Sequence, residues 1–209
     1  QDFFVSTANG QAVARLDQCA TWPNGKLALL GPEGSGKTHL AHVWAEAENG
    51  HVFDADRVAD IDLAKLDQAV AVDHMDSALL SDDVETALFH LHNHLLHARL
   101  PLLLVGRSDP NRWPIRLADL KSRVSGADIA TIAQPDDALL AAMFVKLFAD
   151  RQIQVAANVI PWLVARTERS FAAVQALVEA LDAEALSEKR AITQPLARRV
   201  LDKSGSDEA

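Results

Sequence analysis

A phosphate-binding loop is the feature that most restricts the fold of this chain. Residues 31–38 read Gly-Pro-Glu-Gly-Ser-Gly-Lys-Thr, a full match to the pattern G-x-x-x-x-G-K-[ST]. Lys26–Leu30 before the loop is expected to be a strand, and a helix is expected from about Lys37 to Glu48. In this order, the backbone N–H groups of the loop and the start of the helix can surround a phosphate. The motif therefore predicts a parallel sheet that binds a nucleotide.

The residues of this loop have separate expected tasks. Lys37 is expected to reach the β- and γ-phosphates, and the Thr38 hydroxyl to ligate Mg²⁺. The alternative is a glycine-rich turn that binds nothing, but motif and context together favour a nucleotide. The expected nucleotide-binding residues of the segment are Gly31, Pro32, Glu33, Gly34, Ser35, Gly36, Lys37, Thr38 and His39.

A carboxylate at the end of a second apolar run fits the same chemistry. The run Ala69–Val72 is uninterrupted and ends at Asp73, which we expect to hold Mg²⁺ through water. The alternative is an aspartate that only caps a turn. Many phosphate-loop ATPases place a second carboxylate in the next position, but this chain has His74, and Asp76 can substitute only if the turn folds back. Weak intrinsic hydrolysis is therefore predicted.

Alternating apolar runs and amphipathic stretches place the fold in the α/β class, as a doubly wound, Rossmann-like parallel sheet. The other expected elements of this part are strands at 51–53, 101–105 and 129–132 and a helix from about 82 to 98. Past Gln134 only helices are expected, with Pro135 at a first helical position. The predicted organisation is a nucleotide-binding core at 1–134, a small helical lid at 135–203 and a disordered tail at 204–209.

Composition narrows the function. The formal charge is 20 − 29 = −9, which disfavours a domain that binds mainly the phosphate backbone of nucleic acids. Cys19 is the single cysteine, so a reducing, cytoplasmic location is expected. The longest apolar run, Leu100–Val105, is too short to span a bilayer, and no secretory signal is recognised. The first residue is Gln rather than Met, which suggests that the natural start lies upstream.

These motifs, in this order, resemble the AAA+ proteins of the bacterial replication-initiator (DnaA) group. The strings that carry the resemblance are Asp2–Val5, Gly36–His42, Phe89–Asn93, Leu102–Pro110 and Leu117–Arg123. A core and lid without the initiator's DNA-reading domain are similar to the Hda group of regulatory homologues. That resemblance implies a bound ADP or ATP, and stimulation of ATP hydrolysis on DnaA together with the DNA-loaded sliding clamp. It also implies a clamp-binding N-terminal peptide, which is not visible in this sequence.

The resemblance assigns roles to further residues. Arg123 falls at the arginine-finger position, where a guanidinium acts on the nucleotide of a neighbouring molecule; the alternative is an ion pair with Asp119. Phe4 and Val5 align with a segment that packs against adenine, or else pack in the core. A polar sensor residue is expected within Arg107–Asp109.

The lid position that carries a nucleotide-sensing arginine in the initiator aligns with Ala172. Arg169, one helical turn earlier, either compensates for this loss or is a solvated residue at the start of a helix.

His90, His94 and His97 share a face of the helix expected at 82–98, with His92 nearby. Neither a cysteine nor a carboxylate accompanies them, so we expect a partly exposed helix face rather than a metal site.

The leading hypothesis is an adenine-nucleotide-binding regulator of replication initiation with DnaA and the sliding clamp as partners. No sequence-specific DNA contact and no membrane contact are expected, and self-association stays open. The alternatives are an initiator or helicase-loader ATPase that acts on DNA, and a free-standing phosphate-loop ATPase or kinase.

Overall fold

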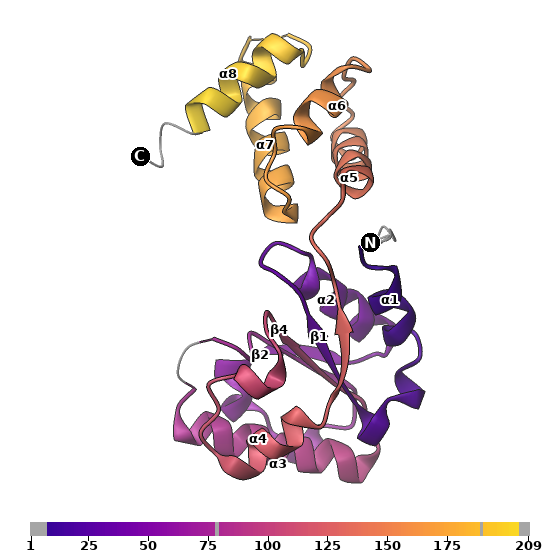
Figure 1. Cartoon of the computed structure of the whole chain (residues 1–209), viewed down its shortest axis with the longest axis vertical. Coiled ribbons are helices and arrows are strands. Elements are labelled where there is room, and N and C mark those ends of the chain that lie inside the picture. The colour runs from indigo at the N-terminus through magenta and orange to yellow at the C-terminus, as the bar shows by residue number, and fades with distance from the viewer. Residues whose placement is uncertain (1–7, 78–79, 189, 205–209) are drawn as a thin grey trace. The chain divides into compact units, whose positions relative to one another are not determined.

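The computed structural model describes residues 8–77, 80–188 and 190–204, which divide into two compact units (Figure 1). The first unit contains Asn9–Ala133. The second contains Ala8 and the chain from Gln134 onward. Each unit has its own buried apolar core.

A five-stranded parallel sheet forms the centre of the first unit, in the order β2-β3-β4-β1-β5. This confirms the predicted α/β class. In this order β1 has β4, β3 and β2 on one flank and β5 on the other, so the chain connections run in opposite directions from β1. Ligands of open α/β sheets bind at the carboxyl ends of the strands where the order reverses in this way, which is the carboxyl end of β1 in this sheet. The strands are β1 Lys26–Leu30, β2 His51–Asp54, β3 Val70–Asp73, β4 Leu102–Gly106 and β5 Asp128–Thr131.

Four of the five strands differ by one residue at one or both ends from the expectation: β2 ends at Asp54 rather than Phe53, and β3 runs from Val70 to Asp73 rather than from Ala69 to Val72. β4 begins at Leu102 rather than Pro101, because the proline nitrogen has no hydrogen to donate to the ladder. The carbonyl of Pro101 nevertheless accepts a hydrogen bond of 3.0 Å from the Val70 nitrogen. β5 runs from Asp128 to Thr131, one residue earlier than expected.

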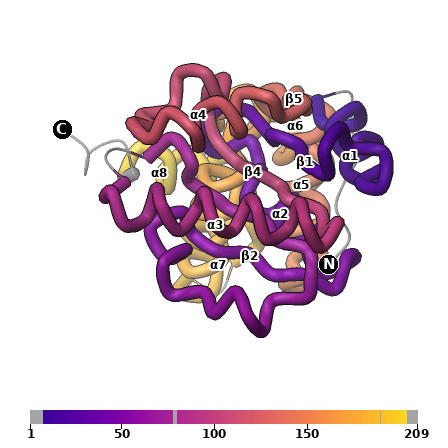
Figure 2. The backbone as a smooth tube through the Cα atoms, turned by 90° about the horizontal axis from the view of Figure 1, so that it is seen from below, coloured from indigo at the N-terminus to yellow at the C-terminus, as the bar shows by residue number. Residues whose placement is uncertain are grey.

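Helices cover both faces of this sheet. α1 (Gly10–Leu16) and α2 (Lys37–Ala47) pack on one face, and α3 (Asp82–Ala98) and α4 (Ala118–Ser125) pack on the other. Figure 2 shows α3 and α4 from the side on which they cover β1 and β4. Every residue of β1 is buried, since helices lie on both sides of it. The short 3₁₀ segments of this unit are Cys19–Thr21, Pro23–Gly25, Ala55–Asp60, Leu63–Lys65 and Pro110–Arg112.

The second unit consists of helices around a core of their apolar faces. Its helices are α5 Asp137–Asp150, α6 Val159–Val164, α7 Phe171–Glu188 and α8 Gln194–Ser204. Pro135 was expected to be the first helical residue, but the helix begins two residues later. The Asp136 side chain instead accepts a hydrogen bond of 2.8 Å from the Leu139 nitrogen and caps a helix that begins at Asp137.

α8 extends to Ser204, which was expected to begin the tail; the rest of that tail, 205–209, lies outside the described residues. In the part of the chain that the structure describes, no helix combines the length and apolar character needed to cross a membrane.

Candidate nucleotide-binding site

The loop between β1 and α2 has the backbone of a phosphate cradle. Gly34 and Gly36 adopt φ angles of +69° and +90°, in the left-handed region that glycine tolerates best. A Cβ on Gly31 would lie 2.6 Å from the Ile132 carbonyl oxygen, so this position also requires glycine. The Oγ of Ser35 is buried, and no hydrogen-bond partner for it is found among the described residues. The loop thus has a buried polar group free for a ligand.

Lys37 lies at the first position of α2 and is buried against the loop. Its Nζ donates a hydrogen bond of 2.7 Å to the carbonyl oxygen of Pro32, within the loop itself. Burial lowers the pKa of Lys37, while the nearby carboxylates of Asp73 and Asp76 oppose that shift. The ammonium is therefore held inside the loop, where an anionic ligand would be its stronger partner.

The two residues expected to bind Mg²⁺ lie side by side. Thr38 Oγ1 donates a hydrogen bond of 2.6 Å to Asp73 Oδ2. Asp73 is buried at the end of β3, and its other oxygen accepts a hydrogen bond of 2.7 Å from the His74 nitrogen. A hydroxyl and a carboxylate are the hard oxygen donors that Mg²⁺ prefers, so the pair fits this ion.

His74 occupies the position where a second carboxylate is common. Its backbone is left-handed, with φ +58°, and its Nδ1 lies 2.8 Å from Asp54 Oδ1 at the end of neighbouring β2. The hydrogen bond with Asp54 raises the pKa of His74. The turn after it does fold back: Asp76 Oδ2 accepts hydrogen bonds from the Arg107 nitrogen at 2.9 Å and from Arg107 Nε at 3.3 Å. Asp76 therefore reaches this edge of the sheet but is already engaged by arginine.

Of the three candidate sensor residues, Arg107 is the one that faces the phosphate loop. It follows β4, whose Gly106 pairs with Leu30 at the end of β1. Its Nη1 lies 3.3 Å from Glu33 Oε2 in the loop. Ser108 and Asp109 have other tasks, since the Ser108 carbonyl accepts from Trp113 and the Asp109 side chain caps a 3₁₀ turn.

Arg123 lies at the opposite edge of the sheet from the phosphate loop. Its carbonyl accepts a hydrogen bond of 2.6 Å from Nζ of Lys26, the first residue of β1, whereas the loop follows Leu30, the last residue. Four residue steps along a strand separate these ends, about 13 Å. The Arg123 guanidinium lies over the Phe89 ring, 5.1 Å from its centroid. No ion pair with Asp119 occurs among the described side chains, contrary to the alternative considered above.

Phe4, Val5, His39 and Arg169 are the remaining predicted site residues. Phe4 and Val5 lie outside the described residues. His39 lies in the first turn of α2, half-buried. Arg169 belongs to the second unit, where it donates to the Pro135 carbonyl at 3.2 Å and pairs with Asp137 at 2.7 Å.

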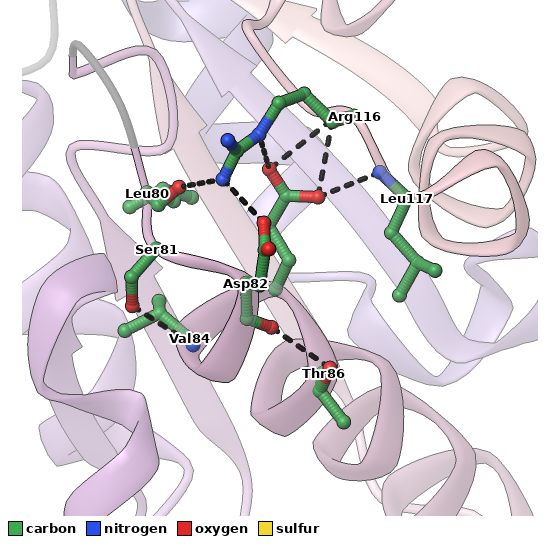
Figure 3. A network of polar contacts seen from close by, with 8 residues as sticks. Leu80, Ser81, Asp82, Val84, Thr86, Arg116 and Leu117 are labelled. Carbon is green, nitrogen blue, oxygen red and sulfur yellow. Dashed lines mark hydrogen bonds and ion pairs between the residues drawn. The ribbon is translucent and has the colours of Figure 1, made fainter.

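A buried anchor for the Arg123 segment was missed from the sequence (Figure 3). Glu85 of α3 is 2% exposed, and its carboxylate accepts hydrogen bonds from the nitrogens of Arg116 and Leu117, just before α4. Arg116 Nη2 also donates to the Leu80 carbonyl and pairs with Asp82. The sequence did contain a signal for this anchor, because Glu85 directly follows Val84 and lies on the apolar side of the helix predicted at 82–98.

The four histidines of α3 fall into two environments. His90 and His97 are exposed, but His92 is buried and its Nε2 lies 3.2 Å from Lys26 Nζ. The face of His90, His94 and His97 is thus partly exposed, as expected, while His92 on another face of α3 makes a buried polar contact with the amino end of β1.

Comparisons with known proteins agree with this geometry. Residues 137–201 match the family model of the Hda lid domain. Domain III of the Thermotoga maritima replication initiation protein DnaA is similar in fold, with a TM-score of 0.82 and 17% identity over 96% of this chain and 94% of that chain. No match is found among the curated proteins.

Two longer proteins share the fold as well. AMPPCP-bound DnaA from Aquifex aeolicus gives a TM-score of 0.72 and 17% identity, over 88% of this chain and 65% of that one. The Thermotoga maritima RuvB Holliday junction branch migration motor gives 0.71 and 17%, over 92% and 68%. This chain thus spans about two thirds of either. The chain thus shares its fold with these DnaA and RuvB structures, and its residues 137–201 are similar to the lid domain of the Hda family.

Proposed function

We propose that this chain is an adenine-nucleotide-binding regulator of replication initiation that stimulates ATP hydrolysis by a DnaA-type initiator. The observation that carries the proposal is the separation of Arg123 from the chain's own phosphate loop, at opposite ends of β1. A guanidinium at that place cannot serve the nucleotide of its own molecule. It can serve a nucleotide on a neighbour, and the Hda lid match makes a DnaA-type protein the neighbour to test.

The nucleotide in this proposal is ADP or ATP, bound at the loop between β1 and α2. Backbone N–H groups of the loop hold the phosphates, and Lys37 exchanges the Pro32 carbonyl for a phosphate oxygen. Thr38 and Asp73 hold Mg²⁺, directly and through water respectively. When bound, Mg²⁺ neutralises phosphate charge. The AMPPCP complex of a DnaA with this fold supports an adenine nucleotide as the ligand.

Arg123 acts in this proposal on the transferring phosphoryl group of the initiator's ATP. Its positive charge stabilises the negative charge that spreads over the phosphoryl oxygens in the transition state, an effect of about 10³–10⁵ in rate for such arginines. The chain's own hydrolysis is weak, because His74 stands where a carboxylate would orient water and Asp76 is held by Arg107. A free-standing ATPase or kinase is for this reason the weaker alternative.

The proposed partners are the initiator and the sliding clamp. Arg169 is proposed to sense the nucleotide from the lid, after release from Asp137. Phe4 and Val5 are proposed to contact adenine.

The test is ATP turnover by ATP-loaded initiator mixed with this protein, clamp and DNA. We expect turnover to rise with the parent and Arg123→Ala to lower the stimulated rate on the order of 10³-fold. Arg57→Ala is the matched control, since Arg57 is an exposed arginine paired with Asp60 in a 3₁₀ segment. Equal stimulation by Arg123→Ala and the parent would refute the proposal.

A further inference from the structure

Lys26 is a buried lysine for which the described part of the chain offers no carboxylate partner. It is the first residue of β1 and is 6% exposed. Across the described residues, no ion pair includes it. Burial, and then the charge of Arg123, lower the pKa of Lys26. Burying an ammonium costs folding free energy unless strong acceptors hold it. The contacts of the Lys26 ammonium therefore indicate its role.

The Lys26 ammonium has one hydrogen-bond partner on α4 and one on α3, the two helices that cover this face of the sheet. Nζ lies 2.6 Å from the carbonyl oxygen of Arg123 in the last turn of α4 and 3.2 Å from Nε2 of His92 on α3. An ammonium can only donate, so His92 Nε2 accepts and the ring proton is on Nδ1. Burial, with Lys26 beside the ring, lowers the pKa of His92 to about 4, which keeps it a neutral acceptor.

The carbonyl that Lys26 binds is one that α4 cannot satisfy by itself. The last four carbonyls of a helix have no partner within the helix, and a positive charge is favourable at that end. α4 has eight residues, so a single contact in its last turn fixes a large part of it. Lys26 thereby holds the main chain of Arg123.

Phe89 holds the side chain of the same arginine. The guanidinium carbon of Arg123 lies 5.1 Å from the centre of the Phe89 ring, within the range of a cation–π contact. Phe89 and His92 are three positions apart on α3 and therefore share a helix face. One face of α3 thus holds Arg123 at two points, through Lys26 at the main chain and directly at the guanidinium.

We propose that Lys26 and Phe89 are positioning residues that aim Arg123 at the nucleotide of the partner molecule. This inference rests on the proposed function. An arginine side chain has many rotamers, and a misplacement of about 1 Å costs on the order of 10²-fold in rate when a group must meet a transition state. A fixed carbonyl and a ring under the guanidinium remove much of this freedom before the partner binds.

The experiment measures initiator ATP turnover against initiator concentration, with clamp and DNA present. Lys26→Met keeps the apolar stem and removes the ammonium; we expect the maximal stimulated rate to fall at least about 10-fold, with the half-saturating concentration unchanged. Phe89→Leu is expected to lower the maximal stimulated rate about 3-fold. Phe89→Tyr keeps a ring face and is expected to restore this rate. Lys65→Met is the matched control, since Lys65 is exposed and pairs with Asp62.

Two further measurements distinguish a change in the orientation of the Arg123 side chain from a loss of the folded state. In NMR spectra of the free protein, we expect the Phe89 ring current to shift the Arg123 side-chain signals. This shift is expected to vanish in Phe89→Leu and to return in Phe89→Tyr. The affinity for ADP is expected to match the parent in each folded variant, because the phosphate loop lies at the other end of β1. If Lys26→Met does not fold, the Phe89→Leu and Phe89→Tyr pair decides.

The outcomes distinguish the two proposals. If Arg123→Ala stimulates as well as the parent, the proposed function is wrong. The function stands and the positioning role is wrong if Arg123→Ala is inactive while both Lys26→Met and Phe89→Leu reach the parent's maximal rate. Where Lys26→Met is unfolded, Phe89→Leu alone decides in the same way.

Discussion

At the scale of single residues, the core unit buries charged groups only where specific partners hold them. Asp73 accepts from a hydroxyl and from the following main-chain nitrogen, and Lys37 donates to a carbonyl of its own loop. Glu85 accepts two main-chain N–H groups and so fixes the segment that leads into α4. Each is therefore a place where one substitution leaves a partner unsatisfied in a buried environment.

Glu85 gives a pH-dependent prediction. Burial by itself would raise the pKa of this carboxyl, but hydrogen bonds from the nitrogens of Leu117 and Arg116 outweigh it and the pKa is lowered. The stabilisation is therefore complete above the pKa of the unfolded chain and is lost as the pH falls through the folded value. We expect Glu85→Gln to lower the free energy of unfolding by about 2 kcal/mol at pH 7.

Urea unfolding between pH 7 and pH 3 tests this prediction. The difference between parent and Glu85→Gln should shrink toward pH 3, because the glutamine does not titrate. Glu46→Gln, at an exposed position of α2, is the matched control and should follow the parent throughout. A constant difference over the range would contradict the assignment.

At the scale of elements, the start of α5 depends on one cap. Because the Asp136 carboxylate accepts from the Leu139 nitrogen, Asp136→Ala is expected to destabilise the second unit by about 1 kcal/mol. Asp136→Asn keeps an acceptor oxygen and should retain most of the stability. Thermal unfolding followed by circular dichroism checks the pair; equal losses in both variants would mean that the charge, not the cap, matters.

The elements that the sequence predicted well are those with a clear period. The strand Lys26–Leu30 and the helix at 82–98 have the predicted bounds, because buried runs and amphipathic stripes depend on neighbours in the chain. α1 was missed, since a helix of seven residues carries too few apolar positions to define a face. The Pro135 assignment was wrong because Asp136 is the better capping residue, and a helix begins after its cap.

Within the candidate site, motif spacing predicted Lys37, Thr38 and Asp73, but not the environment of Arg123. Lys26 is 66 positions from His92 and 97 from Arg123, and only the strand order and the covering helices bring these groups together. No local pattern marks a lysine at the first position of a strand as buried. Long-range contacts of this kind have to come from the structure.

At the scale of the whole molecule, nucleotide binding should raise the stability of the chain. A ligand that binds only the folded state, at 100 times its dissociation constant, adds about 2.7 kcal/mol. We expect ADP with Mg²⁺ to shift the thermal unfolding of the parent upward and Lys37→Met to lose most of this shift, because the variant lacks the loop ammonium. Lys65→Met, the exposed lysine control, should keep it. Scanning calorimetry with and without ADP measures both shifts; an equal shift in Lys37→Met would exclude this loop as the site.

The opposite placement of Arg123 and the phosphate loop also limits the symmetry of any assembly that uses them together. When the arginine of one molecule contacts the loop of the next and the pattern continues in one direction, the contact is heterologous, and the copies repeat head to tail in a ring or an open filament. Two copies joined by one such contact leave one loop and one arginine free at their ends. In a two-fold dimer, each arginine would have to meet the other molecule's loop at the same time, so both groups would have to lie within one self-complementary patch.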